Sequence, residues 1–299
     1  MSRVDLFRRK FLVGAGLASA AMALGPATSG IISKASASFP PVNDTDILNF
    51  ALNLEYLEAE FYLRATTGSG LTDQEATGGT GSPGAVTGGR QVSFAIPAIQ
   101  AYAQAIATDE HNHVLLLKGA LGSSAVSRPV INLQHAFTEA AVAAGIISQG
   151  MRFDPYADDG SFALSAFVFE DVGVTAYHGA APLIASPSIL SVAAGILAVE
   201  AYHAGSIRTV LNQLGQTTAA LISDANKISM LRASADGGSP NGHETPLTDN
   251  AGVHISAADP SDSVAYSRTF REVLRIVYVG AAPGTGGGFF PQGLNGNIR

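Results

Sequence analysis

Residues 108–116 read TDEHNHVLL and place a glutamate, Glu110, three residues before a histidine, His113. Side chains at positions i and i+3 of a helix lie on one face, so this pair can reach a single metal ion. His111 points about 100° away from Glu110 on the same helix, and we assign it a structural or supporting role. The stretch can form one quarter of a metal site if other helices supply the remaining ligands.

A second copy of this spacing occurs at Glu200 and His203, in the sequence EAYH, again inside a long apolar segment. Two further glutamates stand in apolar surroundings, Glu55 in NFALNLEYLEAEFY and Glu170 in SAFVFEDVGVTAY. The order along the chain is therefore Glu, Glu-x-x-His, Glu, Glu-x-x-His, which indicates a repeated helical hairpin. This repeat predicts that four helices each bring one carboxylate to a common centre.

A tyrosine follows each lone glutamate by seven residues, at Tyr62 and Tyr177. Because seven residues are two helical turns, each tyrosine shares a face with its glutamate and is either a core aromatic or a hydrogen-bond donor to a ligand carboxylate. Glu58 competes with Glu55 for the role of ligand, and the spacing to Tyr62 favours Glu55. Glu58 would then be a supporting or surface group, and Glu60 a solvated one.

Four glutamates in an apolar bundle need positive charge beside them to stay ionised. Four bare carboxylates inside an apolar bundle would repel one another and resist ionisation. Two divalent ions bring a charge of +4, which four carboxylates neutralise, and two neutral imidazoles complete the ligand set while positions stay open for oxygen species. The residue pattern therefore predicts a dinuclear site rather than a metal-free polar core.

The chain around these residues is predicted to be helical throughout. Helix caps, prolines in first turns and apolar residues at helical spacing support this, and strand signals are scarce. Nearly 40 residues separate the second and third long helices, enough to cross a bundle. The fold class expected is all-α, a four-helix bundle with one long crossover. We expect long helices at 44–66, 93–121, 161–184 and 188–214, and shorter ones at 133–148, 219–233 and 264–279.

Three regions are expected along the chain. Residues 1–37 form a signal peptide, residues 40–215 form the bundle, and residues 216–299 form a C-terminal helical and irregular extension packed on the bundle. The extension ends in PGTGGGFFPQGLNGNIR, where Phe289 and Phe290 indicate that it docks on the body. The Gly-rich stretch 67–90 is predicted to be a loop, because it has no periodic apolar face.

The N-terminus resembles a twin-arginine export signal. Arg8 and Arg9 precede Phe11 and Leu12, an apolar run follows, and an Ala-x-Ala cleavage site lies at 35–37. The alternatives are an ordinary secretory signal or a membrane anchor, but the run of about 15 residues is short of the roughly 20 that span a bilayer. We expect an exported protein, periplasmic or extracytoplasmic, without stable membrane insertion after cleavage.

Composition excludes several classes of function. The chain has no cysteine, which excludes a disulfide framework, a zinc–thiolate site and a cysteine nucleophile. Its net charge is −7 although basic residues gather at the N-terminus, and this argues against nucleic-acid binding, which needs clustered Lys and Arg. Hydrophobic residues make up 46% of the chain and charged residues 14%, so closely packed helices are expected.

The residue pattern resembles the ferritin-like di-iron or di-manganese carboxylate superfamily, and more closely its exported desiccation-related group. The segments LNFALNLEYLEAEFY, FEDVGVTAYHGAAPLI, AAGILAVEAYHAGSIR and FREVLRIVYVG carry the likeness. The resemblance implies a ferritin-like four-helix bundle that binds two divalent metal ions, Fe or Mn. It also implies the metal ligands, which would be Glu55, Glu110, His113, Glu170, Glu200 and His203.

Two functions are compatible with such a site. One is redox chemistry on peroxide or oxygen, as in a manganese catalase or a di-iron oxidase or peroxidase. The alternative is a non-catalytic protein of stress and desiccation protection, or of the cell envelope, whose metal site is structural. The expected partner is a small oxidant such as peroxide or oxygen, and a homo-oligomer is compatible with the pattern. An iron-storage cage is less favoured, because the C-terminal extension would have to fit at its assembly surface.

Overall fold

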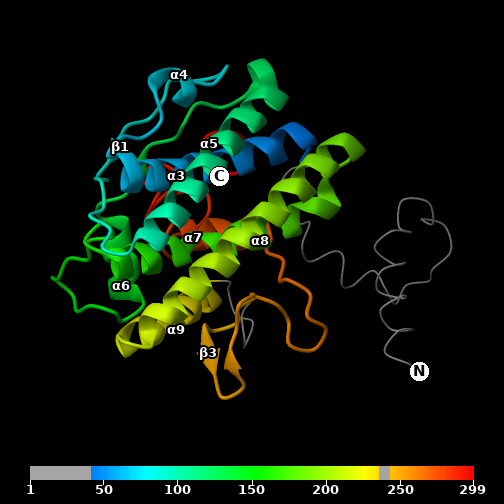
Figure 1. Ribbon diagram of the computed structural model, residues 1–299. Coiled ribbons are helices and arrows are strands. Elements are labelled where there is room, and N and C mark those ends of the chain that lie inside the picture. Colours follow the sequence, from blue (N-terminus) through cyan, green and yellow to red (C-terminus); the bar gives the residue numbers. More distant parts are fainter. Residues whose placement is uncertain (1–41, 236–242) are drawn as a thin grey trace, which may run out of the picture. The chain divides into compact units, whose positions relative to one another are not determined.

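Four long helices form the body of the protein in the computed structural model, which describes residues 42–235 and 243–299 (Figure 1). The predicted signal peptide, residues 1–37, lies outside the described residues. Within Asn43–Arg299 the described chain is one compact unit. The long helices are α3 (Asp44–Thr67), α5 (Pro97–Leu121), α7 (Asp159–Ala180) and α8 (Pro187–Gly215).

Local sequence signals explain where these helices begin and end. Asn43 caps α3 in a reciprocal capping box with Asp46, and Gly68 ends the helix in the left-handed conformation at a φ of 83°. Pro97 and Pro187 occupy the first turns of α5 and α8, where the missing N–H has no partner to lose. Helix α5 therefore begins at its proline, four residues after the start expected from the apolar pattern.

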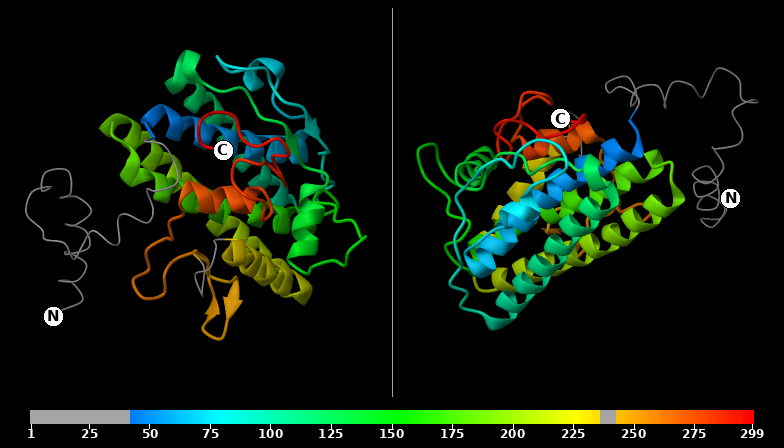
Figure 2. Two further views of the ribbon diagram at one scale, coloured as in Figure 1. Left: turned by 180° about the vertical axis from the view of Figure 1, so that it is seen from behind. Right: turned by 90° about the horizontal axis from the view of Figure 1, so that it is seen from above.

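The helices pair as the repeat predicts, with α3 packed along α5 and α7 packed along α8. Contacts of α3 with α7 and of α5 with α8 close the bundle. The view from above in Figure 2 shows α3, α5 and α8 running alongside one another. The long connection from α5 to α7 contains η1 (Gly122–Ser124), β2 (Ile131–Asn132) and α6 (Ala136–Ala143). The predicted all-α bundle with one crossover is thereby confirmed.

The loops contain short regular segments that the sequence did not indicate. In the Gly-rich stretch, α4 (Asp73–Ala76) is held by a capping box between Thr72 and Glu75, and β1 (Val86–Thr87) pairs in parallel with β2. Farther on, β3 (Thr248–Asp249) and β4 (Gly252–Val253) form an antiparallel pair. The β1–β2 pair joins two distant loops, whereas β3 and β4 form a tight local hairpin, and strands of two residues are too short to leave a periodic signal in the chain.

In the C-terminal extension, α9 (Ala219–Ala235) packs on α8 and α7, and α10 (Phe270–Val277) packs on α7. Phe289 is buried edge-on against the rings of Phe137 and Phe169, and this agrees with the docking expected from the phenylalanine pair. Helix α8 ends at the predicted boundary between bundle and extension. The division into two regions stays a prediction.

A buried ionic network ties the extension to the bundle. Asp171 of α7 accepts two hydrogen bonds from the guanidinium of Arg208 on α8, at 2.9 and 2.8 Å, and one from Arg232 on α9, at 2.7 Å. Arg232 also donates to Glu244, at 2.8 Å. Burial alone would raise the pKa of Asp171, but the two arginines outweigh it and lower the pKa.

Helix α8 is the helix in the described part of the chain that is long and apolar enough to cross a membrane by length and composition. A core helix of a bundle meets the same test. One face of α8 carries Glu200, His203 and Arg208 into the protein interior, where all three are buried. That face is the one from which α8 contributes to the candidate site.

Candidate metal centre

The structure brings all the predicted ligand residues together at the centre of the bundle, where every one is buried. They form two overlapping groups, in each of which the candidate ligand atoms lie within 4.8 Å of one another. Glu110 and Glu200 belong to both groups, which is the arrangement expected of carboxylates that bridge two ions. The first group is Glu55, Glu110, His113 and Glu200, and the second is Glu110, Glu170, Glu200 and His203.

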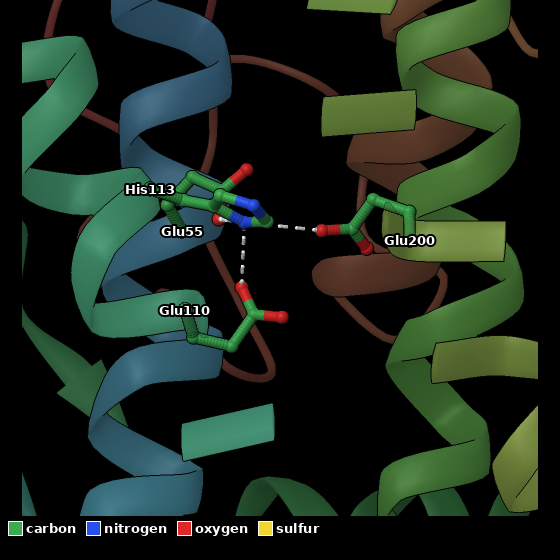
Figure 3. A group of neighbouring side chains, drawn as sticks. All are labelled: Glu55, Glu110, His113 and Glu200. Carbon is green, nitrogen blue, oxygen red and sulfur yellow. Dashed lines mark hydrogen bonds and ion pairs between the residues drawn. The ribbon is translucent and has the colours of Figure 1, made fainter. Parts of the chain in front are cut away.

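His113 is the focus of the first group (Figure 3). Its Nδ1 atom lies 3.2 Å from Oε2 of Glu55, 3.4 Å from Oε2 of Glu110 and 3.5 Å from Oε1 of Glu200. These three carboxylates come from α3, α5 and α8. One imidazole nitrogen that faces three carboxylates can donate a hydrogen bond to only one of them. A cation at this position could bind all four groups, so the arrangement is that of a metal-ligand set.

His203 is the focus of the second group. Its Nδ1 atom lies 2.9 Å from Oε1 of Glu110 and 3.6 Å from Oε2 of Glu170. Its other nitrogen, Nε2, lies 3.1 Å from Oδ2 of Asp109, a carboxylate whose side chain is 47% exposed. A carboxylate behind a ligating histidine fixes the ring orientation and tautomer. The residue pattern does not point to Asp109, because its role depends on a contact between α5 and α8.

Tyr62 and Tyr177 are hydrogen-bond donors to the ligand carboxylates. Tyr62 of α3 donates to Glu170 of α7, and Tyr177 of α7 donates to Glu55 of α3. Each tyrosine thus reaches across the bundle instead of bonding the glutamate that precedes it in its own helix. The crossed pair links the two helices that contribute a single carboxylate each.

The competing groups near these residues occupy other positions. Glu58 is buried beside the centre but lies outside both groups, so the structure places Glu55 at the site. Glu60 is wholly buried and accepts hydrogen bonds from Arg64, at 2.8 Å, and from Arg128. The prediction that Glu60 is solvated was therefore wrong. Arg128 of the crossover reaches Glu60, and the sequence around Glu60 does not indicate that contact.

Two further histidines lie outside the cluster. His111 contacts Glu75 of α4, with its Nε2 atom 2.7 Å from Oε1. His178 lies with its Nδ1 atom 3.1 Å from the carbonyl oxygen of Tyr266. The phase of α5 therefore separates His111 from the centre, as the spacing in TDEHNHVLL predicts.

Glycine at position 173 makes room for a ligand side chain. Gly173 lies on α7 at the point where α8 presents Glu200, and a Cβ atom added there would lie 2.2 Å from Oε2 of Glu200. A distance below 3.0 Å is a steric clash, so a side chain at this position would displace the carboxylate. The close approach of α7 to the Glu200 side chain thus requires glycine.

The electrostatics of the cluster call for a cation. Burial first, and then the charge of Glu55, raise the pKa of Glu110 to about 8. Burial and the charge of Glu110 likewise raise the pKa of Glu200 to about 8. Burial would lower the pKa of His113, but its three carboxylate neighbours raise it above the ordinary value. These shifts show negative charge gathered in a region of low dielectric.

Hydrogen bonding within the described residues leaves part of the cluster unsatisfied. Both carboxylate oxygens of Glu110 and of Glu200, Oε2 of Glu170 and Nδ1 of His203 are buried and make no hydrogen bond of good geometry, although the contacts with His113 and His203 given above bring several of them to 2.9–3.6 Å. Buried polar atoms in proteins almost always make hydrogen bonds. Oxygen and nitrogen atoms that lack them, on side chains that converge on one point, fit a metal-binding site. Four carboxylates and two imidazoles suit Fe and Mn alike.

A four-helix bundle with one glutamate on each of two helices and Glu-x-x-His on the other two defines the ferritin-like class. The chain belongs to the family of the ferritin-like domain, whose model matches residues 43–213. It is 30% identical over 277 residues to the ferritin-like catalase Nec2 of Nesocodon mauritianus, covering 85% of this chain and 84% of that protein.

A second relative is the desiccation-related protein PCC13-62 of Craterostigma plantagineum, which is 35% identical over 173 residues. The match covers 57% of this chain, and the chain spans about half the length of that relative, 54%. No solved structure matches the chain significantly. The relatives and the buried Glu and His groups together support a ferritin-like protein with a di-metal site.

Proposed function

We propose that this protein binds two divalent metal ions through Glu55, Glu110, His113, Glu170, Glu200 and His203, and that it disproportionates hydrogen peroxide. The observation that carries the proposal is the pair of overlapping Glu and His groups that share Glu110 and Glu200. Similarity to a protein named a ferritin-like catalase, along most of both chains, favours peroxide as the substrate. The donor set leaves Fe and Mn as alternatives.

When bound, the two ions would supply the electron exchange by which one peroxide is reduced to water and a second is oxidised to dioxygen. The chain's own residues hold the surroundings in place. The hydroxyl groups of Tyr62 and Tyr177 orient Glu170 and Glu55, and Asp109 orients His203. In the metal-free protein, burial and the charges of the neighbouring glutamates raise the pKa of Glu58, a carboxyl buried beside the ligand groups.

The test combines metal analysis with an oxygen-evolution assay on purified protein. We expect about two Fe or Mn per chain and evolution of oxygen from peroxide. Glu110→Ala should lose metal and activity, because Glu110 belongs to both groups. Glu139→Ala, on the exposed face of α6, is the matched control and should keep both. Protein that contains no metal after growth with Fe and Mn would overturn the proposal.

The similarity to a desiccation-related protein favours one alternative, a non-catalytic protective protein whose metal site holds the bundle together. Metal bound without oxygen evolution, and a melting temperature that falls on chelation, would support this alternative. We also propose export by the twin-arginine route, which moves folded proteins and so suits a chain loaded with metal beforehand. Replacement of Arg8 and Arg9 by Lys should then hold the protein in the cytoplasm.

A further inference from the structure

A cavity of about 350 Å³ opens between the bundle and the C-terminal extension. Helices α6, α7, α9 and α10 contribute its walls, which are mainly aliphatic and aromatic and include Ile146, Phe153, Leu164 and Leu231. The polar residues in the lining are Ser165, Arg232, Ser234 and Arg275. An apolar wall of this kind admits small uncharged molecules and disfavours ions, whose dehydration it does not compensate.

A second, much smaller cavity of about 20 Å³ lies farther inside. It is formed between α3, α7 and α10, and a volume of this size can hold one molecule as small as water. The two cavities share Val168, Ile276 and Phe289 as lining residues. These three side chains therefore form the partition between the outer and the inner cavity.

The inner cavity ends at residues that adjoin the candidate metal centre. Glu58 and Gly173 both line it. Gly173 is the residue whose missing side chain leaves room for the Glu200 carboxylate, within 2.2 Å of the position that a Cβ atom would take. Gly173 therefore both lines the inner cavity and lies against Glu200, one of the two carboxylates common to both ligand groups, although Glu200 itself does not line the cavity.

The opposite side of the centre, between α5 and α8, is more polar. The side chains of His113 and His203 are only 9% and 6% exposed there, and the charged side chain of Asp109 lies outside them. The two sides of the centre therefore differ in the chemistry of the molecules that they favour.

We propose that the two cavities are the entry path of a small uncharged oxidant, no larger than hydrogen peroxide, with Val168, Ile276 and Phe289 at its narrowest point. The inference rests on the proposed function, because it supplies the substrate of the dinuclear centre. It makes the C-terminal extension part of the site, since α10 and Phe289 form one wall of the path.

Substitutions at Val168 test the path in both directions. Val168→Phe should narrow the partition and lower kcat/KM for peroxide at least tenfold, with metal content and kcat unchanged. Val168→Ala should give a kcat/KM at least equal to that of the native protein, and it keeps the test valid if the larger side chain prevents folding. Val192→Phe, on the exposed face of α8, is the matched control and should leave kcat/KM unchanged.

A binding measurement provides a readout that does not depend on turnover. Nitric oxide is small and uncharged, and its association with the Fe(II)-loaded protein can be followed by stopped-flow absorption. Val168→Phe should slow the second-order association at least tenfold relative to Val192→Phe. Equal association rates and equal kcat/KM in these two variants would overturn the path while leaving the proposed function standing. Absence of bound metal in the native protein would overturn both.

Discussion

At the scale of single residues, two hydroxyl groups hold the ligand carboxylates of opposite helices. Tyr62→Phe removes the donor to Glu170 and leaves a buried acceptor unpaired. We expect a loss of about 1–3 kcal/mol in the free energy of unfolding and a metal affinity about tenfold weaker. Chemical denaturation and metal titration measure the two effects.

The chain contains a matched control for this substitution. Tyr56 is also wholly buried on α3, and its hydroxyl donates to the carbonyl of Val126, away from the ligand groups. Tyr56→Phe should therefore lower stability by about 1 kcal/mol without weakening metal binding. Equal metal affinities in the Tyr56 and Tyr62 variants would show that Tyr62 has no part in holding Glu170.

The two histidines of TDEHNHVLL should behave differently when they are replaced. His113→Ala removes the nitrogen that faces three carboxylates, and we expect the protein to lose metal. His111→Ala removes only the contact with Glu75, and it should retain the full metal content by elemental analysis. The reverse result would mean that the helical phase of α5 is wrong.

At the scale of the element, the approach of α7 to α8 depends on glycine. Gly173→Ala forces an added methyl group against the Glu200 carboxylate, and we expect a loss of about 1–3 kcal/mol in stability together with weaker metal binding. Gly195→Ala on α8 has open space around the added atom and should stabilise the helix by up to about 1 kcal/mol. Thermal denaturation with and without metal distinguishes the two glycines.

The attachment of α9 to the bundle depends on a buried charge network. Asp171→Ala leaves Arg208 and Arg232 buried without this partner, and we expect a loss of about 3–5 kcal/mol in unfolding free energy. Asp224→Ala removes a partly exposed pair with Lys227 on the same helix and should lower stability by less than about 1 kcal/mol. Similar losses in the two variants would contradict a structural role for the network.

At the scale of the whole molecule, the metal-free and metal-loaded proteins should respond to pH in opposite ways. The pKa values of Glu110 and Glu200 are raised to about 8 in the folded protein, so the folded state keeps protons that the unfolded state has lost. The contribution of these two glutamates to the free energy of unfolding is fully present below about pH 4.5 and is lost as the pH rises towards 8. We expect the melting temperature of the metal-free protein to fall over that range.

Metal binding should reverse this dependence, because ligand carboxylates must lose their protons to coordinate. We expect protons to be released on binding at pH 7, and affinity to increase as the pH rises. Calorimetry in buffers with different ionisation enthalpies measures the protons released. A proton count of zero would mean that the carboxylates are already ionised in the metal-free protein.

Much of the fold could be predicted from the sequence, because helical periodicity is a local property. Four glutamates on apolar helix faces already indicate that their side chains meet in the interior of one bundle: Glu55, Glu110, Glu170 and Glu200. The partners of those side chains could not be predicted, because they depend on packing between elements. Asp109 contacts His203 only because α8 lies beside α5, and Glu60 accepts a hydrogen bond from an arginine of the crossover. Each tyrosine donates to the glutamate of the other helix, a partner that the seven-residue spacing does not identify.

Residues near Asn295 hold helix α3 in place. Asn295 and Asn53 exchange two hydrogen bonds, at 2.9 and 3.0 Å, across 242 residues of sequence, and Asn53 lies two residues before Glu55. A nascent chain in which Asn295 is not yet made, or is still inside the ribosome, cannot form this contact. The hydrogen bonds that support helix α3 beside Glu55 therefore form only after the chain has been synthesised well beyond the four-helix bundle.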